Sequence, residues 1–324
     1  MRTPAEILEI FNKALDELNL DRQPKGLYDP VRYVLSLGGK RIRPVLLLMA
    51  YELYRDDIST VMPTALGLET YHNYTLLHDD VMDRAEVRRG KPTVHKVWND
   101  NTAILSGDAM LVLAYQLMSK ARSEHLKAVL DLFTETALEI GEGQQYDMEF
   151  ETRMDVREEE YIEMIRLKTS VLLACALKLG AIQADAPASD AENLYHFGEN
   201  LGLAFQLQDD LLDVYGDFAT FGKKIGGDIL CNKKTYLLIN ALRAASPEQR
   251  SELTSWLQRT DYVPEKKVAA VTALYNAIGV RTLAETRIEA CFHDALKYLD
   301  AVALPDDRKM YLRQLALSLL GRKS

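Results

Sequence analysis

The sequence predicts an all-α protein, and three observations support this. Apolar residues recur at three- and four-residue spacing along almost the whole chain, sustained period-two alternation is hard to find, and only short breaks interrupt the pattern. The chain has 324 residues, of which 48% are hydrophobic, which is ample for a sizeable core. Because no break is long or rich in Gly and Ser, we expect residues 1–324 to form a single domain, a helical bundle around a central cavity.

The predicted helices follow one another between these breaks, which contain glycine, proline or paired polar residues. In chain order the breaks fall at residues 22–26, 37–39, 55–57, 89–92, 185–187, 221–228, 246–247, 263–264 and 304–305. Ser246 before Pro247 is typical of an N-cap followed by proline at the first helical position. Asp155 stands before the acidic turn Glu158–Glu160, another helix start signal. We therefore expect each segment between two breaks to be helical.

The charge balance and the cysteines limit the class of protein. The chain has 39 basic and 48 acidic residues, a net charge of −9, which argues against nucleic acid as the main partner. The N-terminus lacks the uninterrupted apolar run of a signal peptide, and the longest apolar runs are too short to span a membrane. Three widely spaced cysteines, an odd number, fit a reducing compartment. We expect a cytoplasmic protein without a membrane span.

Two copies of one acidic motif lie 130 positions apart, each between apolar residues. Residues three and four apart share a helix face, so each copy clusters carboxylates whose mutual repulsion a cation should offset. A solvated acidic face is the alternative for a single copy, but two matching copies favour metal. Mg²⁺ characteristically joins a few carboxylates to substrate phosphates. The predicted metal-binding residues are Asp79, Asp80 and Asp83 in the first motif, and Asp209, Asp210 and Asp213 in the second.

Basic segments accompany both acidic motifs, as phosphates would require. A glycine-led turn with three basic residues, 38–44, opens a helix, where free backbone N–H groups also favour an anion. Residues 88–92 follow the first motif, and residues 221–224 and 232–234 follow the second; each has the alternative of a solvated loop. His72 lies on the same predicted helix as Asp79, two turns earlier, where an ordinary core histidine is the alternative.

The chain resembles the trans-isoprenyl diphosphate synthases, the farnesyl and geranylgeranyl diphosphate synthase group, from about Gly38 to Thr235. The resemblance rests on an ordered set of motifs: GGKRIRP, LETYHNYTLLHDDVMD, RRGKPTVH, SGDAML, GQQYD, KTSVLL, FQLQDDLLD, FGKKIGGD and NKKT. It implies the all-α isoprenoid synthase fold, a homodimer and dependence on Mg²⁺, with three ions expected. It also implies head-to-tail condensation of isopentenyl diphosphate with an allylic diphosphate of C5 to C15.

The resemblance also implies roles for individual residues. Isopentenyl diphosphate is assigned to Lys40, Arg43, His72 and Arg89. The allylic diphosphate is assigned to Arg88, Lys168, Lys223 and Lys233, with metals on Asp79, Asp83 and Asp209, and with Asp80, Asp210 and Asp213 completing the acidic shells. Thr169, the Lys168 carbonyl and Gln206 are expected to stabilise an allylic cation. Asn232-Lys233-Lys234-Thr235 departs from the glycine-led version of its motif, which leaves the choice between Lys233 and Lys234 open.

Product length is expected to depend on the helix of the first acidic motif. Tyr74 and Tyr71 lie five and eight residues before Asp79, three apart on one face, and both should point into the cavity where the chain grows. Position 75 is Thr. In the family, aromatic residues at both near positions suggest C15, whereas a single one resembles the geranylgeranyl type. The sequence therefore favours C20 over C15, with core packing as the alternative for Tyr74.

Three other functions would account for part of the sequence. A terpene cyclase also ionises an allylic diphosphate, but it would not need Lys40, Arg43 and Arg89. A metal phosphohydrolase using His78-Asp79 would need further histidine ligands, and only His72 and His95 are near. A regulatory subunit of a larger prenyl synthase would be expected to have eroded acidic motifs, and both are intact.

Overall fold

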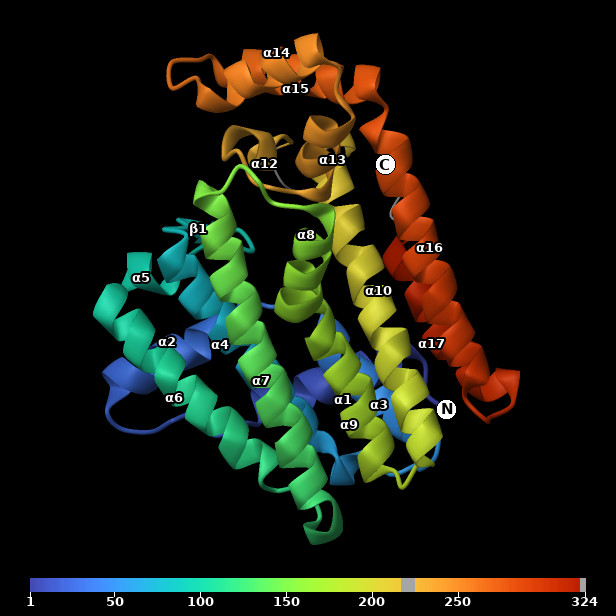
Figure 1. The fold of residues 1–324 in the computed structure, drawn as a ribbon. Coiled ribbons are helices and arrows are strands. Elements are labelled where there is room, and N and C mark those ends of the chain that lie inside the picture. Colours follow the sequence, from blue (N-terminus) through green and yellow to red (C-terminus); the bar gives the residue numbers. More distant parts are fainter. Residues whose placement is uncertain (217–224, 321–324) are drawn as a thin grey trace. The chain divides into compact units, whose positions relative to one another are not determined.

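The computed structural model describes residues 1–216 and 225–320, and nearly all of its elements are helices (Figure 1). The predicted all-α class is confirmed. Lys223 and the basic C-terminus Gly321–Ser324 lie outside the described residues. The chain divides into two compact units: unit 1 consists of Met1–Thr134, Cys175–Leu194 and Ala303–Leu312, and unit 2 of the remaining described residues. That residues 1–324 form one domain stays a prediction.

Unit 1 contains the helices of the N-terminal half. They are α1 (Pro4–Asp16), α2 (Lys25–Ser36), α3 (Ile42–Glu52), η1 (Ile58–Thr60), α4 (Met62–Met82), α5 (Val94–Val97) and α6 (Asp100–Met118), with the strands β1 (Val87–Arg88) and β2 (Lys91–Pro92). It also holds parts of α7 (Ser123–Thr152), α9 (Val171–Gln183), α10 (Ala188–Tyr215) and α17 (Asp306–Leu320). The helix α4 packs along α6, and α2 packs against both.

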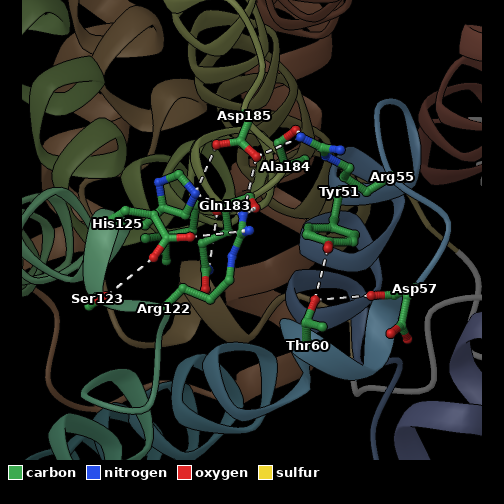
Figure 2. A network of polar contacts seen from close by, with 12 residues as sticks. Tyr51, Arg55, Asp57, Thr60, Arg122, Ser123, His125, Gln183, Ala184 and Asp185 are labelled. Atoms are coloured by element: carbon green, nitrogen blue, oxygen red, sulfur yellow. Dashed lines mark hydrogen bonds and ion pairs between the residues drawn. The ribbon is translucent and has the colours of Figure 1, made fainter.

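A polar junction around Asp185 joins three helix ends in unit 1 (Figure 2). Asp185 follows α9 in the left-handed conformation, with φ of 58°. Its carboxylate accepts from Arg55 at 2.7 Å, near the end of α3, and lies 3.3 Å from Arg122 and 3.0 Å from His125, near the start of α7. Arg122 also donates to the Gln183 carbonyl at 2.7 Å. The predicted break at 185–187 is therefore a turn that connects distant helices.

The break predicted at residues 89–92 is part of a small hairpin rather than a plain turn. The strands β1 and β2 pair antiparallel, with Arg88 opposite Lys91. The two residues between them, Arg89 and Gly90, have φ of 52° and 74°. Positive φ at both loop positions is the type I′ geometry that matches the twist of a two-residue hairpin. The two arginines next to the first acidic motif are thus held on a defined turn.

Unit 2 contains the other parts of the shared helices and most of the C-terminal half. Its own elements are α8 (Glu158–Ile165), the π turn η2 (Arg166–Ser170), α12 (Gly227–Leu230), α13 (Tyr236–Ala244), α14 (Pro247–Gln258), α15 (Pro264–Ile278) and α16 (Val280–Ala301). A core cluster that includes Leu207, Leu237, Val271 and Ile288 joins α10, α13, α15 and α16. Within the described ranges, no helix is long and apolar enough to cross a membrane.

The helix start signals in unit 2 had different outcomes. Ser246 is the N-cap of α14, and its hydroxyl accepts from the Gln249 N–H at 3.2 Å within a capping box. Glu158–Glu160 form the first turn of α8, as expected, but the N-cap is Arg157 and not Asp155. Asp155 instead accepts from Arg153 at 2.9 Å. An N-cap can be predicted from sequence when its hydrogen-bond partner lies three residues away, as at Ser246. The bond that Arg153 donates to the Asp155 carboxylate could not be predicted in this way.

Candidate active site

The first acidic motif lies at the C-terminal end of α4. Asp80 is buried, Asp79 is half-buried and Asp83 is exposed at the C-cap. Arg88 Nε lies 2.8 Å from both oxygens of Asp80, and Arg88 Nη2 lies 3.7 Å from Asp79. Burial raises the pKa of Asp80 although the Arg88 bonds oppose this. The motif therefore combines one buried carboxylate, bonded to the Arg88 guanidinium, with two more accessible carboxylates.

Arg89 contacts the glycine turn that precedes α3. Its guanidinium donates to the Gly38 carbonyl and lies against Gly39, which has φ of 127°. A Cβ added at Gly39 would stand 2.8 Å from Arg89 Cζ, too close for two carbon atoms. Glycine is favoured here by the backbone conformation, and a Cβ would require the Arg89 guanidinium, at the end of a flexible side chain, to shift. This contact brings two separate basic motifs of the sequence together.

Arg43 and His72 form a pair in the same part of unit 1. Arg43 Nη1 lies 3.2 Å from His72 Nε2. Burial, reinforced by the charges of Arg43 and Arg89, lowers the pKa of His72 well below its usual value. His72 is thus a neutral acceptor at physiological pH, and Arg43 keeps its charge although burial lowers its pKa to about 10. Lys40 is exposed in the adjacent turn.

Arg41, the third basic residue of the glycine-led turn, has a structural role. It has φ of 48° and its side chain is almost fully buried. It donates to Glu69 Oε1 at 2.6 Å and to the Leu35 carbonyl at 2.6 Å. Asn73 donates to the same Glu69 oxygen at 2.9 Å. This network holds the turn that carries Lys40 and Arg43, while Arg41 itself is not available to a ligand.

The second acidic motif lies near the end of α10 in unit 2. Asp210 is buried and accepts from the Tyr161 hydroxyl and from Gln206 Nε2, the latter at 3.2 Å. Burial, together with the nearby charge of Asp228, raises the pKa of Asp210 to about 7. Asp213 is also buried and accepts from the Asp228 N–H at 3.0 Å. Asp209 is half-buried. This end of α10 therefore concentrates acidic groups, and both burial and the charge of Asp228 oppose ionisation of Asp210.

Lys168 and Thr169 lie in the π turn η2, which a plain helix prediction did not anticipate. Lys168 Nζ lies 2.5 Å from Asp147, and the Thr169 hydroxyl lies 3.3 Å from Gln206 Oε1. A Cβ added at Gly143 would stand 2.4 Å from the Lys168 backbone nitrogen, so α7 reaches η2 only through a glycine. Single π turns often occur at functional sites. Here the turn brings Thr169 to Gln206, and the Gln206 amide nitrogen in turn donates to Asp210.

The two lysines after α12 have different surroundings. Burial alone would raise the pKa of Asp147, but the ammonium groups of Lys233 and Lys168 outweigh it and lower the pKa. The charge of Lys233 also acts on Asp210. Lys234 instead donates to the Glu151 carbonyl at 2.8 Å. These contacts favour Lys233 as the lysine that serves the second acidic motif.

The residues predicted to limit product length lie together on α4. The ring centroids of Tyr71 and Tyr74 are 5.5 Å apart, and those of Tyr71 and Phe133 are 5.1 Å apart. Tyr74 contacts the ring of His78 at 4.8 Å and packs in a cluster with Met110. The Thr75 hydroxyl donates to the His72 carbonyl at 2.8 Å. Tyr71 and Tyr74 thus form one aromatic layer.

The donor set fits a hard divalent cation. Both motifs offer carboxylate oxygens without cysteine, and the raised pKa values of Asp80 and Asp210 indicate sites where a further positive charge would be favourable. Within the part of the chain that the structure describes, no group of three or more acidic, His or Cys side chains is placed to hold a metal ion.

Several residues of the two sites were missed by sequence reasoning. Tyr161 and Asp228 contact the second motif from α8 and α12, and Glu69 supports the basic turn. Asp147 belongs to a motif that was recognised, GQQYD, but it received no role. Asp228 and Glu69 likewise stand in recognised motifs, FGKKIGGD and LETYHNYTLLHDDVMD, without having received a role. Only Tyr161, which reaches Asp210 across the fold, lay outside every recognised motif.

Comparisons with known proteins point in one direction. The sequence profile of the polyprenyl synthetase family matches residues 24–277. Geranylgeranyl diphosphate synthase of Methanosarcina mazei is 43% identical over 230 residues, 70% of this chain and 71% of the relative. A solved geranylgeranyl pyrophosphate synthase is 44% identical with a TM-score of 0.95, covering 100% of both chains. Another, from Corynebacterium glutamicum in complex with isoprenyl diphosphate and magnesium, is 30% identical with a TM-score of 0.86, covering 99% and 98%.

Proposed function

Because the chain belongs to the polyprenyl synthetase family, we propose that it condenses isopentenyl diphosphate with an allylic diphosphate to give geranylgeranyl diphosphate. It is a short-chain prenyltransferase. The observation that carries this conclusion is the match over residues 24–277, combined with two intact acidic motifs that each have basic partners. The two motifs lie in different compact units, and their joint action on one diphosphate is part of the proposal.

The residues divide the work of the proposed reaction. Lys40, Arg43, His72 and Arg89 hold isopentenyl diphosphate, with neutral His72 keeping Arg43 in place. Arg88, Lys168 and Lys233 neutralise the allylic diphosphate as its C–O bond breaks, since diphosphate leaves only when its charge is compensated. The Thr169 hydroxyl, the Lys168 carbonyl and Gln206 Oε1 stabilise the allylic cation. The double bond of isopentenyl diphosphate then attacks, and the released diphosphate takes the proton. Lys223 is assigned to the allylic diphosphate by resemblance alone.

We propose magnesium as the cofactor, with three ions. Asp79, Asp83 and Asp209 would hold the ions, and Asp80, Asp210 and Asp213 would complete the acidic shells. The ions supply positive charge to the leaving diphosphate. Support comes from the oxygen-only donor set and from the relative of Corynebacterium glutamicum solved with magnesium. The protein's own positive charge toward the diphosphate would come from Arg88, Lys168 and Lys233, of which Arg88 also bonds both Asp80 oxygens.

Product analysis by mass spectrometry tests the proposed reaction. Incubation with isopentenyl diphosphate and each of the C5, C10 and C15 allylic primers should yield C20 diphosphate as the main product, without a cyclic hydrocarbon. A hydrocarbon formed from the allylic primer alone would support the terpene cyclase instead. Phosphate release without a new carbon–carbon bond would support the hydrolase, and an inert protein the regulatory subunit.

We propose that the aromatic layer of Tyr71 and Tyr74 ends the product cavity. Tyr74→Ala should shift the product distribution upward by at least one C5 unit, because the ring occupies volume that the next isoprene unit needs. Tyr74→Phe, which keeps the ring, is the matched control and should leave the distribution unchanged. If neither Tyr74→Ala nor Tyr71→Ala lengthens the product, the aromatic layer does not end the product cavity, and the next residues to test are those on α6 around Met110–Leu113.

We also propose that the protein forms a homodimer. The helix α6 exposes Ile104, Leu105 and Val112 on one face, with exposed fractions of 45%, 60% and 68%. An apolar face of this kind favours association with a second surface. Light scattering at micromolar protein should give the mass of two chains, and the mass of a single chain would contradict the proposal.

A further inference from the structure

Lys267 on α15 is a fully buried lysine without a carboxylate partner among the described residues. Its exposed fraction is 0%. Its ammonium donates to Asn232 Oδ1 at 2.7 Å and to the Leu230 carbonyl at 3.5 Å, and it lies 4.4 Å from the centre of the Tyr262 ring. Lysine is almost never fully buried unless it is paired, because the charge loses its hydration. An apolar side chain of similar length would not carry this desolvation cost.

The partner of Lys267 lies in a turn with left-handed backbone. Asn232 has φ of 54°, in a region that asparagine adopts more readily than most residues other than glycine. Its side chain is held at both ends, since its amide nitrogen donates to the Leu257 carbonyl at 3.0 Å while its oxygen accepts from Lys267. The turn leads into α13, where Thr235 is the N-cap. Lys267 therefore stabilises one particular conformation of the segment 231–235.

This conformation separates the next two lysines. Lys233 is exposed, and its N–H donates to the Asp228 carbonyl at 2.9 Å, which ties it to the segment beside Asp213. The charge of Lys233 acts on Asp147 and Asp210, whereas Lys234 is bound to the Glu151 carbonyl. A change of the backbone at Asn232 would alter the direction of both side chains.

We propose that Lys267 is a positioning residue for diphosphate binding: by fixing the left-handed turn at Asn232, it holds Lys233 toward the second acidic motif. The inference rests on the proposed function, in which Lys233 binds the allylic diphosphate. Lys267 does not touch the substrate. An apolar side chain at this position could not donate a hydrogen bond to the Asn232 amide oxygen.

The first test compares two neighbouring lysines. Lys267→Met should raise the KM for the allylic diphosphate about tenfold, the size expected for weakening one charge-assisted contact, and leave the KM for isopentenyl diphosphate unchanged. The melting temperature should stay the same or rise. Lys266→Met, which removes an exposed charge one residue earlier, is the matched control and should change none of these. A lowered melting temperature with unchanged KM values would overturn the inference, as would equal effects on both substrates.

The second test couples Lys267 to its partner. Asn232→Gly permits the positive φ but removes the side chain that Lys267 holds. In that background Lys267→Met should add little to the KM of the allylic substrate; an undiminished tenfold effect would show that Lys267 acts by another route.

A binding measurement separates this inference from the proposed function. Calorimetric titration of the full chain with inorganic pyrophosphate and Mg²⁺ should show about tenfold weaker binding in Lys267→Met than in Lys266→Met. If the unmodified protein forms no prenyl product, the proposed function fails, and this titration still decides the role of Lys267. Equal pyrophosphate affinity in the two variants would refute it.

Discussion

Asp79→Ala and Asp209→Ala should each lower kcat by about 10³-fold or more. The positive charge held by these carboxylates is expected to contribute ~4 kcal/mol to the transition state, and each 1.4 kcal/mol corresponds to about a factor of ten. The fold should survive, because removing one acid from a cluster of like charges costs little. Steady-state kinetics at saturating Mg²⁺ and both substrates measures the effect.

A nearby acid provides the control for these variants. Glu86 lies three residues beyond the first motif, and its side chain is 81% exposed in a pair with Lys96. Glu86→Ala should keep nearly full turnover. If Asp79→Ala or Asp209→Ala behaved like Glu86→Ala, the assignment of that motif to catalysis would have to be abandoned.

Glu69→Ala should reduce the free energy of unfolding by about 3–5 kcal/mol, the usual effect of breaking a buried ion pair from one side. The Arg41 and Glu69 side chains are 4% and 2% exposed, so the guanidinium left behind is shielded from water. Denaturant unfolding measures the loss. Asp100→Ala, which breaks the exposed pair with Arg84, is the control and should cost less than about 1 kcal/mol.

Glu69 also gives a functional readout, because its network holds the turn that carries Arg43. Glu69→Ala should raise the KM for isopentenyl diphosphate more than that for the allylic substrate, in the same direction as Arg43→Ala. Equal effects of Arg43→Ala on both substrates would show that the basic residues are divided wrongly between the two diphosphates.

Much of the secondary structure could be predicted because its causes are local. Apolar spacing indicates which segments are helical, and Ser246 was recognised because its capping partners lie within three residues. The hairpin at 87–92 was missed, since its two-residue strands are too short to show any alternation. The π turn at Lys168 was also missed, because it goes with the close approach of α7 at Gly143, 25 residues earlier.

The sequence by itself determined the helical class, the two acidic motifs and the kinds of basic residue around them, since spacing on a single helix places Asp79 beside Asp83 and Asp209 beside Asp213. Only the tertiary structure decided how those residues are used. It buried Arg41 against Glu69, bonded Arg88 to Asp80, and distinguished Lys233 from Lys234. It also buried Lys267 against Asn232. These outcomes depend on which groups lose water and which partner lies across the fold, and neither is encoded in the spacing of residues along one helix.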